Sequence, residues 1–144
     1  MSACVIDASA VLAHLFGENG GDEASDWMDR GSAISTANAQ EVIAQLVVRD
    51  VRNGVDADQA LADAVRDFDA LVLDVMDLTI EDATQAGAWG PYQKKSNLSA
   101  GDRCCLALGK RLGLPVVHGE QGWQPLADEL GLKLVLIREA RDAH

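Results

Sequence analysis

Five short apolar runs alternate with longer helical patterns along this chain, and that alternation limits the possible folds more than any other feature. The apolar runs are residues 4–6, 33–34, 71–73, 116–117 and 134–137. Short apolar runs bounded by turn residues are typical of buried strands. Strands separated by helices are joined by right-handed crossovers into a mostly parallel sheet that is covered on both faces. We therefore expect an α/β fold, a three-layer α/β/α domain around a central sheet of about five strands.

The helical patterns are defined by apolar spacing and by residues that begin and end helices. They cover residues 9–16, a short acidic stretch through residue 27, residues 38–52, a stretch that begins at Asp56 or Asp58, and residues 79–90, 99–112 and 123–130. Residues 93–97 are interpreted as a polar link. The 144 residues contain no repeat or linker, so we expect one domain over residues 1–144.

Charge and cysteine content narrow the class of protein. The 23 acidic residues outnumber the 12 basic ones and give a net charge of −11, which argues against loose electrostatic binding to nucleic acid. The three cysteines form neither a disulfide framework nor a zinc-binding spacing. No signal-peptide pattern and no apolar run of membrane-spanning length is present. We expect a cytoplasmic protein that does not enter a membrane.

Four acidic residues lie where successive segments of the chain meet. Asp7 follows the first strand, Glu120 follows the fourth, and Glu41 and Asp102 lie in the first turns of predicted helices. Ligands in parallel α/β sheets collect at the carboxyl ends of strands, and helices that follow strands begin at the same edge. The fold can therefore bring all four carboxylates together.

Helix capping is the structural alternative for three of the four acids, and Glu120, which follows Gly119, could be an ordinary turn residue. Asp7 could cap the helix that follows it, although Ser9 could do so equally well. Glu41 and Asp102 each come three residues after a capping residue, Asn38 and Ser99, which is the spacing of a capping box. The same spacing in Thr79 and Asp82 shows no sign of chemistry. The conjunction of four acids nevertheless favours a site, because four separate structural explanations would otherwise be needed.

Clustered carboxylates point to a divalent metal ion. Mg²⁺ and Mn²⁺ prefer hard oxygen ligands, and several carboxylates placed close together repel one another unless a cation compensates their charge. Such an ion can activate water and neutralise charge that develops on a phosphodiester.

The chain resembles the PIN-domain ribonucleases, specifically the VapC-type toxins. The resemblance is carried by VIDASAVLA at the start, NAQEV in the middle, and LSAGDRCCLALGKRLGLPVV with GEQGW near the end. It covers the whole chain and implies a PIN-like α/β/α fold, a Mg²⁺ or Mn²⁺ cofactor and endonucleolytic cleavage of RNA. By motif, Asp7, Glu41 and Asp102 become the metal ligands, and Glu120 is the fourth catalytic residue.

The sequence departs from the family pattern after the fourth strand. Many members have a Thr-Ala-Asp-like triplet where this chain has His118, Gly119 and Glu120. Glu120 is one methylene longer than Asp, so we expect it to act through water or another ligand rather than to bind the metal directly. His118 is a candidate for binding substrate phosphate or assisting proton transfer, although a single His at a strand end is more often a packed or hydrogen-bonded residue. Ser9 is a candidate to hydrogen-bond a ligand carboxylate, with helix capping as its alternative.

Candidate RNA contacts are few. Arg103 follows Asp102 and is a candidate for contact with phosphate. The other basic candidates are Lys94, Lys95, Lys110 and Arg111. The structural alternative for these basic residues is that they lie on a solvated helix face. The three tryptophans, Trp27, Trp89 and Trp123, could stack on bases but are better explained by core or interface packing.

The family also implies a homodimer and a cognate VapB-type antitoxin that covers the helices after the second strand. Val47, Val48 and Val51 widen the apolar face of the first long helix, as a partner groove requires. The acidic charge of the chain favours an antitoxin tail that carries Arg or Lys.

The leading hypothesis is a Mg²⁺- or Mn²⁺-dependent endoribonuclease toxin that cleaves structured RNA, tRNA or rRNA, at a single-stranded site and leaves a 5′-phosphate and a 3′-hydroxyl. One alternative is a catalytically weakened PIN fold that binds an antitoxin-like partner without cleaving RNA. Another is an aspartyl-phosphate protein, which is the weakest because Ser9 stands where a second Asp would be needed.

Overall fold

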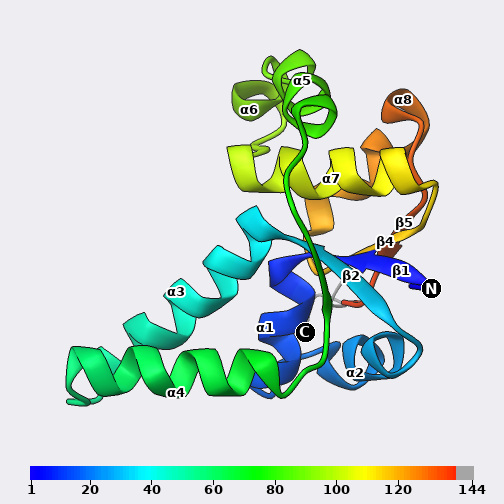
Figure 1. The fold of residues 1–144 in the computed structure, drawn as a ribbon. Coiled ribbons are helices and arrows are strands. Elements are labelled where there is room, and N and C mark those ends of the chain that lie inside the picture. The colour runs from blue at the N-terminus through cyan, green and yellow to red at the C-terminus, as the bar shows by residue number, and fades with distance from the viewer. Residues whose placement is uncertain (139–144) are drawn as a thin grey trace, which may run out of the picture.

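The computed structural model describes residues 1–138 and contains one five-stranded sheet in which every neighbouring pair is parallel (Figure 1). Its strands are β1 (Cys4–Ile6), β2 (Ser32–Ser35), β3 (Asp74–Met76), β4 (Val116–His118) and β5 (Leu134–Leu136). They are arranged in the order β3-β2-β1-β4-β5, so the first strand lies at the centre. The predicted parallel sheet of about five strands is confirmed.

Eight α-helices and one 3₁₀ helix connect the strands within residues 1–138. They are α1 (Ala8–Leu15), α2 (Gly21–Asp29), α3 (Thr36–Arg52), α4 (Ala57–Asp69), α5 (Ile80–Ala88), α6 (Tyr92–Lys95), α7 (Ala100–Leu112), η1 (Gln121–Leu126) and α8 (Ala127–Leu130). Among the described residues, no helix combines the length and the apolar character that crossing a bilayer requires.

Two apolar cores sandwich the sheet, because successive side chains of a strand point to opposite faces. On β1, Cys4 and Ile6 belong to the core that packs under α1–α4, whereas Val5 belongs to the core under α5 and α7. On β4, Val117 belongs to the core under α1–α4 and Val116 to the core under α5 and α7. The result is three layers, as expected from the alternation of strands and helices.

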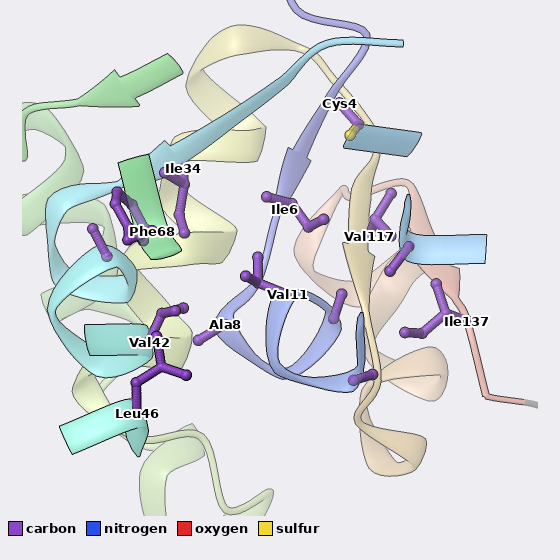
Figure 2. Close-up of a cluster of buried hydrophobic side chains, with 14 of the residues drawn as sticks. Cys4, Ile6, Ala8, Val11, Ile34, Val42, Leu46, Phe68, Val117 and Ile137 are labelled. Carbon is purple, nitrogen blue, oxygen red and sulfur yellow. The ribbon is translucent and has the colours of Figure 1, made fainter. Parts of the chain in front are cut away.

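The first of these cores is shown in Figure 2, where Ile6 and Val117 from the central strands meet side chains from α1, α3 and α4. Its labelled members include Val11, Val42, Leu46 and Phe68, and nearly all are fully buried. Packing on the sheet holds the start of α3 in place, whereas its far half runs with α4 away from the sheet (Figure 1).

The cysteines and tryptophans behave as structural residues. All three cysteines are free thiols, and two of them, Cys4 and Cys105, are buried. Trp89 and Trp123 are buried in the second core, which confirms the packing interpretation for both. Trp27 packs against the first core and has the guanidinium of Arg30 3.7 Å from its ring centre.

The third strand was predicted in the wrong place. Residues 71–73 form no strand, because Val72 has a positive φ of 55° and is exposed, while Leu71 and Leu73 pack against the first core from a turn. The strand follows at Asp74–Met76, where Ala33 pairs with Asp74.

Two other boundaries differ. The predicted polar link at residues 93–97 includes the end of the short helix α6, and the predicted helix at 123–130 is a 3₁₀ helix, with Pro125 inside it, followed by one turn of α-helix. Proline at that position removes a backbone donor, which is compatible with the tighter irregular turn.

Candidate functional site

Asp7 is the most buried member of the acidic set, at 2% exposed, and it ends the central strand. It is the N-cap of α1: its Oδ2 accepts hydrogen bonds from the backbone N of Ser9 at 3.0 Å and from the Ser9 hydroxyl. Its Oδ1 accepts from Nδ2 of Asn38 at 3.3 Å. Both carboxylate oxygens therefore have fixed donors, which hold the side chain in one orientation.

Asn38 is a buried link between three motifs that are far apart in sequence. Its Nδ2 donates to Asp7 and also to the carbonyl oxygen of Gly101 at 3.3 Å, just before Asp102. Its Oδ1 accepts from the hydroxyl of Ser35, the N-cap of α3. The sequence pattern assigned Asn38 only a capping role, but the structure makes it the residue that ties β1, α3 and α7 together.

Glu41 lies one turn deeper in its helix than predicted. Ser35, not Asn38, caps α3, so the helix begins at Thr36 and Glu41 falls in the second turn rather than the first. The predicted capping box is therefore wrong, because Glu41 does not return to its cap residue. A methyl group added at Gly101 would lie 3.9 Å from Oε2 of Glu41, which places this carboxylate beside the start of α7.

Asp102 does form the predicted capping box. Its side chain accepts from the backbone N of Ser99 at 3.0 Å, and its own N donates to the Ser99 hydroxyl at 3.1 Å. Burial raises the pKa of Asp102, while the two Ser99 hydrogen bonds and Arg103 oppose the rise. Thr79 and Asp82 form an equivalent capping box on α5, and there Asp82 forms an ion pair with Arg111 at 2.7 Å.

The carboxylates lie close enough together to raise one another's pKa. Burial raises the pKa of Asp7 to about 7, and repulsion from Asp102 and Glu41 adds to the effect against the Ser9 hydrogen bonds. Burial and then Asp102 raise the pKa of Glu41, and the same two causes raise the pKa of Glu120, which Arg138 opposes. The four predicted acids thus gather at one edge of the sheet, with Glu120 on the exposed rim.

The donor set fits a hard divalent cation by its chemistry. Every charged group in the cluster is a carboxylate oxygen donor, and the mutual repulsion is the kind that a bound cation would relieve. Over residues 1–138, no three His, Cys, Asp or Glu side chains already stand close enough to hold an ion. Binding would therefore require these side chains to close around the metal.

Ser9 does not cap its helix, because Asp7 holds that position. Instead, its hydroxyl donates to Asp7 and accepts from the backbone N of Gly119 at 2.9 Å. This geometry supports the interpretation in which Ser9 hydrogen-bonds the carboxylate, and it connects β1 to the loop after β4.

Two predicted substrate-binding residues are turned inward. His118 is fully buried, its Nε2 is 2.8 Å from Oε1 of Gln124, its Nδ1 accepts from the N of Glu120, and its ring stacks on Trp123. Burial accordingly lowers the pKa of His118. The proposed phosphate contact is wrong for this residue, because neither ring nitrogen is accessible.

Arg103 is likewise committed to protein acceptors. Its guanidinium donates to the carbonyl oxygen of Ala86 at 3.1 Å and to Oε1 of Gln93 at 2.7 Å, which joins α7 to α5 and α6. Among the other basic candidates, Lys110 donates to the carbonyl of Leu130 and Arg111 pairs with Asp82, so both also serve the fold.

Sequence reasoning missed Arg138, which lines a cavity of about 680 Å³ beside Glu120. Arg138 follows β5 as Asp7 follows β1, so the same strand-end argument could have identified it.

A family model described as PIN domain matches residues 4–128. No curated protein sequence matches significantly.

Solved structures share the fold at low identity. A toxin–antitoxin complex from Klebsiella pneumoniae is 16% identical with a TM-score of 0.66, over 94% of this chain and 98% of that one. A DNA-bound VapBC from Salmonella typhimurium is 15% identical with a TM-score of 0.66, over 95% and 99%. VapBC-5 from Mycobacterium tuberculosis is 17% identical with a TM-score of 0.60, over 96% and 100%.

Proposed function

This chain belongs to the PIN-domain family, and from that premise we propose that it is a metal-dependent endoribonuclease that serves as the toxin of a toxin–antitoxin pair. PIN domains are generally nucleases, so hydrolysis of phosphodiester bonds is the coarse assignment. The observation that carries the proposal is the convergence of three carboxylates at the carboxyl edge of the sheet. Asp7 is hydrogen-bonded to Asn38, which also donates to the carbonyl oxygen of Gly101 just before Asp102, and Glu41 lies beside Gly101.

The residues of the chain prepare this edge for catalysis. Ser9 and Asn38 orient the two oxygens of Asp7, and the first turn of α7 presents Asp102. In the proposal, Asp7, Glu41 and Asp102 hold a Mg²⁺ or Mn²⁺ ion, which would supply an activated water and neutralise charge on the phosphodiester. Glu120, on the exposed rim, suits contact through water with the ion or the substrate.

Structured RNA cleaved at a single-stranded site is the proposed substrate, on the resemblance to VapC-type toxins. The net charge of −11 fits a nuclease that does not bind RNA indiscriminately. An enzyme of this charge would depend on local cations to hold its substrate.

A VapB-type antitoxin is the proposed partner, together with a second copy of the chain in a homodimer. Several apolar side chains on α3 and α4 are about 40–50% exposed, namely Val48, Val51, Leu61 and Val65. The structures that share the fold include complexes of toxin with antitoxin. A partner with an apolar helix would complement the exposed apolar side chains of α3 and α4. A basic tail on the same partner would complement the acidic edge.

A PIN fold that binds its partner without cleaving RNA is the second candidate. It is favoured by one observation, that no three donors among residues 1–138 already stand in a metal-binding arrangement. Affinity for Mn²⁺ distinguishes the two, because only the nuclease needs a site that closes on the ion.

Cleavage of total tRNA and rRNA by the antitoxin-free protein tests the proposal. We expect discrete fragments with Mg²⁺ or Mn²⁺ and none with EDTA or with Asp7→Ala. Asp102→Asn and Asp82→Asn form a matched pair, because each changes the third residue of a capping box. Loss of cleavage in the first alone assigns the chemistry to the site. Equal activity of the two variants, or fragments that persist in EDTA, would refute the assignment.

A further inference from the structure

A cavity of about 680 Å³ adjoins the acidic cluster on the side toward β5. It is lined by residues 17–19 after α1, residues 119–122 after β4, and Arg138 after β5. Arg138 is the one cation among these described residues, and the proposed catalytic chemistry does not use it. The cavity continues the edge at which the carboxylates meet, since Glu120 belongs to both.

Arg138 has a donor that the protein does not satisfy. Its Nη2 donates to Oε1 of Glu18 at 3.2 Å, in an ion pair whose side chains are 30% and 47% exposed. Its Nε is enclosed, yet within residues 1–138 it has no hydrogen-bond acceptor. A buried donor without an acceptor is costly, and native proteins rarely leave one without a protein or solvent partner. The guanidinium is therefore held by Glu18 and enclosed at Nε, while the partly exposed side chain still lines the cavity.

Gly119 makes room for this arginine. A methyl group at Gly119 would lie 2.8 Å from Nε and 3.4 Å from Cζ of Arg138. The backbone N–H of Gly119 donates to the Ser9 hydroxyl, which in turn donates to Asp7. The loop after β4 is therefore anchored to Asp7.

We propose that Arg138 and this cavity form a phosphate subsite that holds a phosphodiester of single-stranded RNA beside the acidic cluster. The inference rests on the proposed function and extends it to a residue that binds substrate. A guanidinium matches phosphate with a planar fork of donors, and the partly exposed Arg138 side chain lines the cavity that would receive the phosphate.

The two rim carboxylates favour a nucleotide over a free phosphate ion. Glu18 and Glu120 are exposed acceptors beside the arginine and would repel a bare anion. A ribonucleotide brings hydroxyl and amino donors as well as its phosphodiester, so it can contact the guanidinium and the carboxylates together.

Binding without cleavage tests the subsite independently of catalysis. The ¹⁵N-labelled protein in EDTA is titrated with an unphosphorylated RNA pentanucleotide, and separately with inorganic phosphate, while the Nε–Hε signal of Arg138 is followed. Arg138→Lys identifies that signal by removing it. We expect a saturable shift with RNA, and a weaker response or none with phosphate.

Fluorescence anisotropy measures how strongly each variant binds the RNA. Arg138→Gln should weaken RNA binding about tenfold, as loss of a charge-assisted hydrogen bond does, and should reduce the salt slope by about 0.7. Gly119→Ala should weaken binding at unchanged net charge by displacing the arginine. Arg66→Gln is the charge-matched control, because Arg66 pairs with exposed acids on α4, and we expect a change below twofold.

The proposal is overturned if the Arg138 signal does not shift with RNA, if it shifts with inorganic phosphate alone, or if Arg138→Gln matches Arg66→Gln. Circular dichroism spectra identical to wild type are required of each variant. If cleavage fails while the RNA-dependent shift is present, the nuclease assignment is wrong and the subsite stands.

Discussion

Replacing Asp7 by Asn is expected to stabilise the metal-free protein at high pH. Burial, with repulsion from Asp102 and Glu41, raises the pKa of Asp7 from 3.8 to about 7. A raised carboxyl pKa means that the folded state binds the proton more tightly than the unfolded state does. Stability is therefore lost as the pH rises from about 4 through about 7, because the unfolded chain ionises first.

The magnitude follows from the two pKa values. At about 1.36 kcal/mol per pKa unit, a rise from 3.8 to about 7 corresponds to about 4 kcal/mol of destabilisation at pH 8. Linkage places about 2–3 kcal/mol of that loss between pH 5 and pH 8. Asn removes the charge and can still accept from the N of Ser9, but its amide meets Nδ2 of Asn38, which costs about 1 kcal/mol. A net gain of about 3 kcal/mol at pH 8 remains.

Urea denaturation in EDTA at pH 5 and pH 8 measures the difference. Asp56→Asn is the matched control, since Asp56 caps α4 in the same way but is exposed, and its effect should stay within about 0.5 kcal/mol at both pH values. The reasoning is refuted if Asp7→Asn is less stable than wild type at pH 8, or if its advantage does not grow between the two pH values. Either result would mean that the buried carboxylate is stabilised by the fold itself.

Three other outcomes are expected. At pH 8, Mg²⁺ at about 100 times its dissociation constant should raise the unfolding free energy of the wild type by about 2.7 kcal/mol in a urea titration, and Asp102→Asn should lose most of that gain; an equal gain in both would place the ion elsewhere. Asn38→Ala should cost about 2–4 kcal/mol by denaturation, because it leaves buried partners in β1, α3 and α7 unsatisfied, and a loss below about 1 kcal/mol would contradict the link described above. His118→Phe should keep most of the cleavage rate while losing about 1–2 kcal/mol of stability, because the ring is packed on Trp123; a hundredfold loss of rate in folded protein would restore a direct role for the imidazole.

Local patterns predicted most of the fold, since hydrophobic period and capping residues act over a few positions. The central strands and the capping box at Asp102 were found in this way. The third strand was misplaced because β3 lies at the edge of the sheet, where pairing with β2 decides its register and the apolar run before it packs as a turn.

The positions of strand ends and helix starts were enough to predict the acidic residues of the candidate site, but not the residues that support them. The acids were identified by their place after strands and at helix starts, and the structure brings them together. Arg138 follows β5, so the strand-end argument was available for it but was applied only to acidic residues. Asn38 was missed because its importance depends on contacts across the sheet that no local pattern encodes. His118 and Arg103 were overestimated for the same reason, since nearness in sequence to an acid says nothing about which way a side chain turns.

The strand order also sets when the site can exist during synthesis. The central strand β1 leaves the ribosome first, but its neighbour β4 begins only at Val116, and two of the four acids lie at or beyond residue 102. Contacts this distant in sequence form only after most of the chain is available. A growing chain therefore cannot assemble the acidic edge until β4 and Glu120 have emerged from the ribosome. The edge is completed late, although the central strand that precedes Asp7 is made before the other four strands.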